Sequence, residues 1–269
     1  PDKLTMKKYL VVGNPIEHSL SPQLHNFWIK NNNINAVYEK KKLNDNELIG
    51  LVSQVREKKI HGINITVPFK KKIIPFLDNL SYESEKTQSV NTIYLDNGKV
   101  VGHNTDIEGF ERSIKDSNLD IQNKKVLILG AGGVVPSLIF VLNKIKASQI
   151  IISNRTKNKA ENLKDLFHNL TIIDWGKVCE FDMIINATSV GLKKEDELNL
   201  DLSKIGKDKF FYDIIYKPNE TNFLKIGKKL GNKTQNGKLM FVYQALAAFK
   251  MWHGIEPSID KKVLNLLDQ

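Results

Sequence analysis

An unbroken apolar run that leads directly into glycines constrains the fold of this chain more than any other feature. Residues 126–129 read Val-Leu-Ile-Leu, and Gly130-Ala131-Gly132-Gly133 follows them. A strand without polar alternation is typical of a parallel sheet that is covered on both faces. Glycines between such a strand and a helix allow a tight turn in which backbone N–H groups approach a pyrophosphate. This half of the chain is therefore predicted to form a Rossmann-type, doubly wound, dinucleotide-binding domain.

Strands and helices are predicted to alternate beyond the glycines as well. The third position of the glycine fingerprint is Val135 rather than glycine or alanine. We assign residues 107–238 to this domain, and we expect the helices predicted within 239–269 to pack back on the first domain. Further strands are predicted over 150–152, 170–173, 182–186 and 210–215, and helices from the glycines to about residue 146, over 157–167, over 239–250 and over 259–267.

The end of the second strand in this domain selects the cofactor. Folds that bind NAD usually carry an acidic residue there, which hydrogen-bonds to the ribose hydroxyls. This chain has Asn154-Arg155-Thr156 instead, so no carboxylate would repel a 2′-phosphate. Arg155 can stack on adenine and pair with that phosphate, and Thr156 can donate a hydrogen bond to it. The sequence therefore favours NADP over NAD.

The first part of the chain, residues 1–106, is predicted to be an α/β domain that binds substrate and carries catalytic residues. Its apolar runs alternate between strand and helix periods. The pair Asn97-Gly98 between two such runs is a strong signal for a hairpin. Strands are predicted over 8–13, 36–42, 60–67, 91–95 and 100–103, and helices over 21–32, 45–58 and 68–77.

The segment Asn64-Ile-Thr-Val-Pro-Phe-Lys70 places polar groups and an amine where a strand runs into the third predicted helix. Because side chains alternate along a strand, Asn64 and Thr66 are expected to share one face. Pro68 suits the first turn of a helix. The positive end of the helix dipole would disfavour a cation there, so Lys70 is predicted to give up its proton more readily than a surface lysine does. Such a segment is suited to holding a polyol beside a proton donor.

Two serines form a second candidate group. If the chain around Ser19 and Ser21 is extended, both hydroxyls point the same way and can bind a carboxylate without a buried counter-charge. In the alternative, Ser21 is only the N-cap of the next helix.

Composition excludes several classes of function. Lys and Arg number 40 against 30 Asp and Glu, but they are spread along the chain without interleaved aromatic residues, so nucleic-acid binding is not expected. No apolar run is long enough to cross a membrane, and residues 1–6 carry no signal-peptide pattern, so a cytoplasmic location is expected. A single cysteine, Cys179, excludes a disulfide framework, and His18 and His25 lack a third ligand, so no metal is predicted.

The ordered set of motifs resembles the shikimate dehydrogenase family. No single motif is decisive, but the set runs from about residue 8 to residue 255 and is specific. Besides Asn64–Lys70 and the glycines 130–133, it consists of Ser19-Leu-Ser-Pro22, Val90-Asn-Thr92, Gly102-His-Asn-Thr-Asp106, Asn154-Arg-Thr156, Asn186-Ala-Thr-Ser-Val-Gly191 and Gln244.

The resemblance implies reversible, NADPH-dependent reduction of 3-dehydroshikimate to shikimate, a step of chorismate and aromatic amino acid biosynthesis. It also implies that Lys70 and Asp106 are the catalytic pair. Such a reduction leaves negative charge on the ketone oxygen, which a protonated lysine can stabilise and protonate. The expected partner is a small-molecule substrate, and the protein is expected to be a monomer or a homodimer.

By the same resemblance, the remaining polar residues bind substrate and cofactor. Ser19, Ser21 and Tyr216 would hold the substrate carboxylate, and Asn64, Thr66, Asn91 and Gln244 would hold the ring hydroxyls. Thr188 and Gly237 would lie near the nicotinamide, and Gly130, Ala131, Gly132, Gly133, Asn154, Arg155 and Thr156 would bind the rest of NADP.

Two alternatives stay open at this point. An NAD-dependent quinate/shikimate dehydrogenase would share the fold, but Asn154-Arg155-Thr156 and the two serines argue against it. A non-catalytic NADP-sensing module belongs to another class. The joint presence of Lys70, Asp106 and the hydroxyl-binding set argues against that reading.

Overall fold

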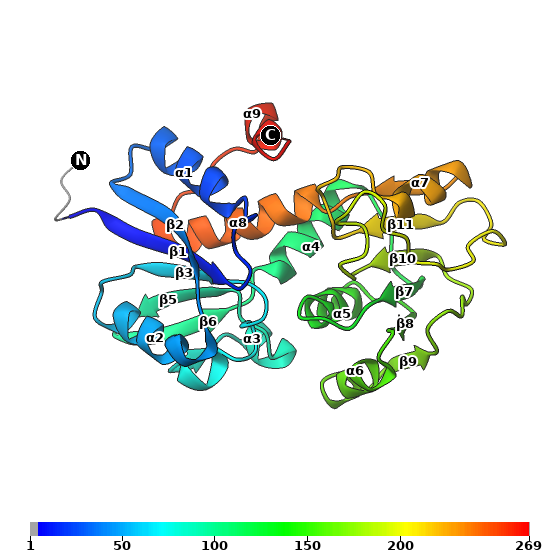
Figure 1. Cartoon of the computed structure of the whole chain (residues 1–269), viewed down its shortest axis with the longest axis horizontal. Helices are drawn as coiled ribbons and strands as arrows, with labels where there is room; N and C mark the ends of the chain where they lie inside the picture. Colours follow the sequence, from blue (N-terminus) through cyan, green and yellow to red (C-terminus); the bar gives the residue numbers. More distant parts are fainter. Residues whose placement is uncertain (1–4, 269) are drawn as a thin grey trace. The chain divides into compact units, whose positions relative to one another are not determined.

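A computed structural model of the chain describes residues 5–268 and divides into two compact units (Figure 1). Unit 1 joins the residues up to Gly109 with those from Val242 onward, and unit 2 is the continuous segment between them. The divisions fall inside two continuous helices, α4 (Asp106–Asp116) and α8 (Lys238–His253). The expectation drawn from residues 1–6 lies mostly outside the described residues. The assignment of the two units to substrate and cofactor stays a prediction.

Unit 1 contains a six-stranded mixed sheet in the order β2-β1-β3-β5-β6-β4. The strands β1, β2 and β3 are parallel, whereas β5 is antiparallel to both β3 and β6. The predicted hairpin is confirmed, because Asn97 and Gly98 both have the positive φ angles of a type I′ turn. The strands are β1 (Lys7–Gly13), β2 (Ala36–Lys42), β3 (Gly62–Ile65), β4 (Asn79–Leu80), β5 (Thr92–Asp96) and β6 (Lys99–His103).

Helices cover both faces of this sheet (Figure 1). The α2 helix packs on the face that carries Leu10 and Ile63, and the packed apolar side chains there form a core. The α1 and α8 helices lie on the other face, where Trp28 and Phe249 meet with ring centroids 5.4 Å apart. The helices are α1 (Ser21–Asn31), α2 (Leu48–Arg56) after a 3₁₀ turn η1 (Asp45–Glu47), α3 (Tyr82–Thr87), α8 and α9 (Lys261–Leu266).

The helix predicted over 68–77 is wrong. The chain after β3 forms turns and ends in one 3₁₀ turn, η2 (Ile74–Phe76). In a helix, the Lys70 carbonyl would accept a hydrogen bond from the Ile74 N–H. Instead, that N–H donates to the Lys71 carbonyl, and the Lys70 carbonyl accepts from the Val90 N–H at 2.8 Å. A hydrogen bond to a residue distant in sequence thus replaces the local helical bond.

Unit 2 contains a fully parallel six-stranded sheet in the order β12-β11-β10-β7-β8-β9. Residues 126–129 of the central β7 are all 0% exposed, so this strand is covered on both faces as its sequence predicts. The strands β8 and β9 lie on one side of β7, and β10, β11 and β12 lie on the other, which gives the doubly wound order and confirms the predicted fold class. The strands are β7 (Lys125–Leu129), β8 (Gln149–Ser153), β9 (Leu170–Ile173), β10 (Met183–Asn186), β11 (Phe210–Asp213) and β12 (Lys233–Gln235).

In unit 2, helices follow the three strands β7, β8 and β11. The predicted helices after β7 and β8 are confirmed, although α5 begins only at Val135, which is fully buried. The helices α4 and α7 were not predicted. The helical segments are α5 (Val135–Lys144), α6 (Lys157–Asn162), the 3₁₀ turn η3 (Leu163–Asp165) and α7 (Asn222–Lys229).

Candidate active site

Lys70 and Asp106 form a salt bridge in unit 1. Lys70 Nζ lies 2.7 Å from Asp106 Oδ2, and the two side chains are only 15% and 10% exposed. A hydrogen bond between charged groups at this distance is stronger than one between neutral groups. Because most of the solvent is excluded, the charges act through a lower local dielectric than at the surface. The sequence-predicted catalytic pair is therefore brought together.

The backbone around the pair places a helix end at the carboxylate and not at the amine. Asp106 is the first residue of α4, and its N–H donates to Asn104 Oδ1 at 3.1 Å. The positive end of the α4 dipole favours a negative charge at this position. No helix begins at Lys70, so the predicted influence of a helix dipole on Lys70 is wrong.

Asn64 and Asn91 belong to one buried hydrogen-bond network, and they are 6% and 4% exposed. Asn64 Nδ2 donates to the Asn91 carbonyl and to Thr92 Oγ1, each at 3.1 Å. Asn91 Nδ2 donates to Thr105 Oγ1 at 2.9 Å, and Asn91 Oδ1 accepts from the Thr105 N–H at 2.7 Å. Because Thr105 directly precedes Asp106, the same network holds the backbone that carries the carboxylate.

Tyr38 is also part of this network, although its role was not predicted from the sequence. Its hydroxyl donates to Asn64 Oδ1 at 2.7 Å, and the Ser21 side chain hydrogen-bonds to Tyr38. Burial raises the pKa of Tyr38 well above its ordinary value, so the phenol stays protonated and remains a donor. A signal was present in the sequence, because Tyr38 is an aromatic residue beside the charged run Glu39–Lys42. In the structure it is the one buried side chain of β2.

Ser19 and Ser21 lie close together, but neither predicted geometry is present. The Ser21 N–H donates to Ser19 Oγ at 3.3 Å. Leu20 between them has φ −94° and ψ 1°, which is not extended, and it is the N-cap of α1. Ser21 is thus the first helical residue rather than the cap. Ser21 is buried and Ser19 is half-buried, and their binding of a carboxylate stays a prediction.

Three other predicted substrate ligands are half-buried, and within residues 5–268 they make no hydrogen bond to one another. Thr66 follows β3, and its methyl group would collide with a Cβ at Gly13. Tyr216 packs on Phe241 with ring centroids 4.7 Å apart, and burial raises the pKa of its phenol. Gln244 lies on α8. The structure does not join these three to the Asn64 network, so their roles stay predictions.

Two glycines in the glycine loop of unit 2 differ in their surroundings. The fold requires glycine at Gly130, whereas Gly132 has free space around it. Gly130 has φ +113°, and a Cβ there would lie 2.9 Å from the Ala187 carbonyl oxygen. A side chain at this position would be strained as well as crowded. Gly132 is exposed, and a Cβ there would meet nothing within 4 Å. Exposed glycine backbone ahead of a helix fits the approach of a pyrophosphate.

Thr188 and Gly237 both have structural roles. Thr188 Oγ1 donates to Asn186 Oδ1 at 2.7 Å and accepts from the Val190 N–H at 3.1 Å. Asn186 Nδ2 in turn donates to Asp213 Oδ1 at 3.2 Å, and burial raises the pKa of Asp213 to about 6. A Cβ at Gly237 would collide with the Ile214 carbonyl. The Thr188 contacts shape the loop after β10, and Gly237 allows the close approach of the chain after β11, whatever the two residues bind.

The end of β8 carries exposed groups that fit a phosphate. Arg155 and Thr156 are exposed, and the Arg155 guanidinium lies 5.6 Å from the centroid of the Trp175 ring. Asn154 Nδ2 donates to the Thr156 carbonyl at 2.9 Å, which fixes the turn. Lys157 beside them is paired with Asp174 at 2.8 Å. Because β8 is the neighbour of β7, these side chains lie at the same sheet edge as the glycine loop. The donor set fits NADP, whose extra phosphate needs a cation.

Two further observations concern metal-ligand clusters and long apolar helices in the described part of the chain. Residues 5–268 contain no group of three or more His, Cys, Asp or Glu side chains that could hold a metal ion. No helix in the same stretch is long and apolar enough to cross a membrane. Cys179 is half-buried, and burial raises the pKa of its thiol.

Two family models match the chain. One is described as the shikimate dehydrogenase substrate binding domain and matches residues 11–93. The other is described as shikimate / quinate 5-dehydrogenase and matches residues 112–214. The first match lies in unit 1, and the second lies in unit 2.

Known proteins are similar over almost the whole chain. A shikimate dehydrogenase (NADP(+)) of Pelagibacter ubique is 59% identical over 262 residues, which cover 97% of this chain and 99% of the relative. The crystal structure of shikimate dehydrogenase from Aquifex aeolicus has a TM-score of 0.90 at 37% identity and covers 100% of both chains. A shikimate dehydrogenase solved in complex with NADP+ has a TM-score of 0.93 at 32% identity, covering 100% of this chain and 96% of its own.

Proposed function

The chain belongs to the shikimate dehydrogenase family, and we propose that it catalyses the reversible NADPH-dependent reduction of 3-dehydroshikimate to shikimate. The chain is an oxidoreductase that uses NADP, as do its relatives of known sequence and structure. The observation that carries the proposed reaction is the 2.7 Å contact between Lys70 Nζ and Asp106 Oδ2. The contact provides a partly shielded proton donor in the unit that the substrate-binding family model matches.

In this proposal, Lys70 and Asp106 handle the proton. NADPH, when bound, would supply the hydride for the ketone carbon, and negative charge would then develop on the ketone oxygen. The Lys70 ammonium stabilises that charge and donates a proton to the oxygen. Asp106 orients the ammonium through their hydrogen bond, and the N-terminus of α4 favours the negative charge of Asp106.

Two asparagines are proposed to bind ring hydroxyls with complementary groups. Asn64 Oδ1 can accept two hydrogen bonds and receives one from Tyr38. Asn91 Nδ2 can donate two and gives one to Thr105. Asn64 is therefore available to accept from one hydroxyl, and Asn91 is available to donate to another. Their buried partners hold both amides in place before substrate arrives, which lowers the entropic cost of binding.

Other side chains complete the proposed substrate site. Ser19 Oγ accepts from the Ser21 N–H and keeps its own hydrogen for a carboxylate oxygen. The Tyr216 phenol stays protonated because burial raises its pKa, so it is a second neutral donor. Thr66 and Gln244 are half-buried polar residues, and they are assigned to the remaining hydroxyls by the family resemblance.

Cofactor binding is proposed to use backbone at one end and cationic side chains at the other. The exposed glycines Gly132 and Gly133 would admit the pyrophosphate to the N-terminal side of α5. Arg155 would meet the 2′-phosphate, with Thr156 as a further donor. Ala131 and Asn154 would shape the turns, and Thr188 and Gly237 would lie near the nicotinamide.

Absorbance of the reduced nicotinamide tests substrate, cofactor and reaction together. We expect the absorbance to rise when the protein is mixed with shikimate and NADP+, with lower kcat/KM for quinate and for NAD. No change with any substrate would overturn the reaction. Equal or better use of NAD would overturn only the preference for NADP, and equal use of quinate would favour the quinate/shikimate alternative.

A further inference from the structure

A hollow lies in unit 1 at the end of the sheet opposite Lys70. It has a volume of about 200 Å³ and is lined by the first residues of β1, the C-terminal end of α2, the segment before β3, part of β5 and the last turn of α8. Lys70 follows the carboxyl end of β3, whereas Ile60 and His61 of the hollow precede its amino end. The hollow is therefore separate from the proposed catalytic pair by the length of that strand.

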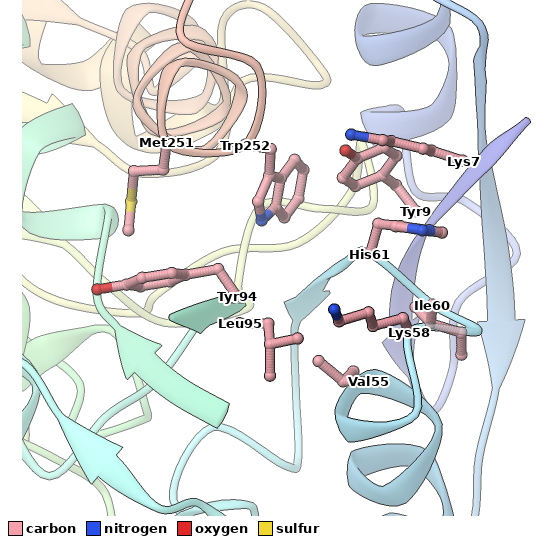
Figure 2. A pocket seen from close by; sticks show the side chains of 10 residues that line it. All are labelled: Lys7, Tyr9, Val55, Lys58, Ile60, His61, Tyr94, Leu95, Met251 and Trp252. Atoms are coloured by element: carbon pink, nitrogen blue, oxygen red, sulfur yellow. The ribbon is translucent and has the colours of Figure 1, made fainter. Parts of the chain in front are cut away.

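Aromatic rings form the walls of the hollow (Figure 2). Trp252 lies against Tyr9 with ring centroids 5.0 Å apart, and Tyr94 lines the space from β5. Trp252 Nε1 donates to the Ile93 carbonyl at 3.1 Å, so the indole is held in one orientation. Gly62 has no side chain, and a Cβ there would collide with the indole. Tyr9 is only 2% exposed, whereas Trp252 and Tyr94 are half-buried, so these two rings offer the apolar surfaces against which another flat ring can stack.

The polar groups that line the hollow are cations and donors. Neither Lys7 nor Lys58 has a carboxylate partner among residues 5–268. His61 Nδ1 accepts from the Lys8 N–H at 3.2 Å, so the proton of the neutral ring is on Nε2, which is then a donor. Burial and, next, the charge of Lys7 lower the pKa of His61. The hollow thus combines two ammonium groups with a neutral donor.

Carboxylates near the hollow are already engaged or lie to one side. Glu57, next to Lys58 in sequence, is paired with Lys59 at 3.0 Å. Burial and, next, the charge of Asp96 raise the pKa of Tyr94, so this carboxylate acts on the Tyr94 side of the hollow. None of the lining side chains is acidic. Burial and, next, the charge of Lys7 lower the pKa of His253 to about 4.

We propose that this hollow binds a small aromatic carboxylate. A dry cavity of roughly 150 Å³ holds a benzene molecule, so about 200 Å³ has room for one ring and its carboxylate. The ring stacks against Trp252 and Tyr94, and the carboxylate meets Lys58 and the His61 Nε2–H. A neutral ring would leave the ammonium groups without a partner, and an aliphatic anion would leave the aromatic walls without one.

Fluorine NMR with 4-fluorobenzoate as the probe tests the site on the full chain. Saturable broadening of the fluorine signal is expected, and the neutral 4-fluorobenzamide should bind at least about fivefold more weakly, because one ion pair is lost. Excess shikimate with NADP+ should leave the binding curve unchanged, since the hollow is separate from Lys70. Displacement of the probe by shikimate or NADP+ would overturn the proposal, because the probe would then occupy the proposed active site.

Matched variants locate the binding. Lys58→Met keeps the aliphatic stem and should weaken probe binding about fivefold, while Lys59→Met, one residue away and outside the lining, should not. Gly62→Ala should displace the indole and abolish saturation, with the thermal transition showing that the variant folds. Three results would each overturn the proposal. They are equal binding of the acid and the amide, an unchanged probe affinity in Lys58→Met, and a change in sedimentation that accompanies the loss of probe binding. The last result would assign this face to a second copy of the chain.

Discussion

Unit 1 assembles its candidate site from buried side chains that bind one another, whereas unit 2 uses bare backbone and exposed side chains. Lys70, Asp106, Asn64 and Asn91 all have protein partners at 2.7–3.1 Å. In unit 2, Gly132 is open and Arg155 reaches into solvent over Trp175. The difference teaches that the side chains of the candidate site in unit 1 are held in position without a ligand. The candidate site in unit 2 instead consists of an open glycine loop and an exposed positive charge. Substitutions in unit 1 should therefore affect the chemistry, and those in unit 2 should affect cofactor affinity.

The largest effect is expected from the amine of unit 1. Lys70→Ala should lower kcat by about 10³-fold with little change in substrate affinity, because a general acid contributes on the order of 10²–10⁴. Steady-state kinetics together with substrate titration would measure this. Lys71→Ala removes the neighbouring exposed amine and should leave kcat unchanged. Unchanged turnover in Lys70→Ala would remove Lys70 from the mechanism.

The next effect tests a buried carboxyl of unit 2. Burial raises the pKa of Asp213 from 3.8 to about 6, so the folded state holds its proton more tightly than the unfolded state. The folded state therefore loses stability as pH rises from about 4 to about 6, by roughly 3 kcal/mol in total. Asp213→Asn removes this titration, so the free energy of unfolding of the variant should rise relative to that of the parent as pH rises over that range.

Urea denaturation at several pH values would measure the effect of Asp213. Trp175 is the tryptophan of unit 2, so its fluorescence reports the unit concerned. Asp201 supplies the control, since hydrogen bonds from Ser203 lower its pKa and Asp201→Asn should show no such gain. If the difference in free energy of unfolding between Asp213→Asn and the parent stays constant with pH, the raised pKa of Asp213 is contradicted.

A third prediction separates the two uses of glycine in unit 2. Gly130→Ala should lower the free energy of unfolding by about 2 kcal/mol, because it adds a strained φ and a close contact. Gly132→Ala should change it by less than about 0.5 kcal/mol, since nothing lies near its Cβ position. The same Gly132→Ala variant should nonetheless bind NADP more weakly. Wild-type NADP affinity in this variant would exclude Gly132 from the cofactor site.

The smallest effect concerns the exposed cation. Arg155→Gln should raise the KM for NADPH about tenfold and leave that for NADH unchanged, because one charge-assisted contact to the 2′-phosphate is lost. Lys159→Gln removes an exposed charge nearby and should change neither value. An equal increase in KM for NADPH and for NADH would show that Arg155 does not bind the 2′-phosphate.

Features decided by local sequence could be predicted, and features decided by distant partners could not. The apolar run of β7 and the Asn97-Gly98 turn act within a few residues, and the structure confirms both. The predicted helix over 68–77 fails because the Lys70 carbonyl bonds to Val90, which no local pattern reveals.

The candidate site shows the same division. Lys70 and Asp106 could be named from motifs, and the structure adds their 2.7 Å contact. The start of α4 had a signal that was overlooked, because Asp106 and Glu108 place two acidic residues in its first turn. The bond from Tyr38 to Asn64 needs the strand order β2-β1-β3, which follows only from the assembled sheet.

The discontinuity of unit 1 sets an order on synthesis at the ribosome. Trp252 and Phe249 cover Tyr9 and His25, but they are made only after all of unit 2 has been translated. At about 5–20 residues per second, the strands of unit 1 wait on the order of ten seconds for that cover. Unit 2 is one continuous stretch and can fold as soon as it emerges. The nascent chain therefore passes through a state in which unit 2 is complete and the earlier part of unit 1 still exposes an aromatic face for chaperones to bind.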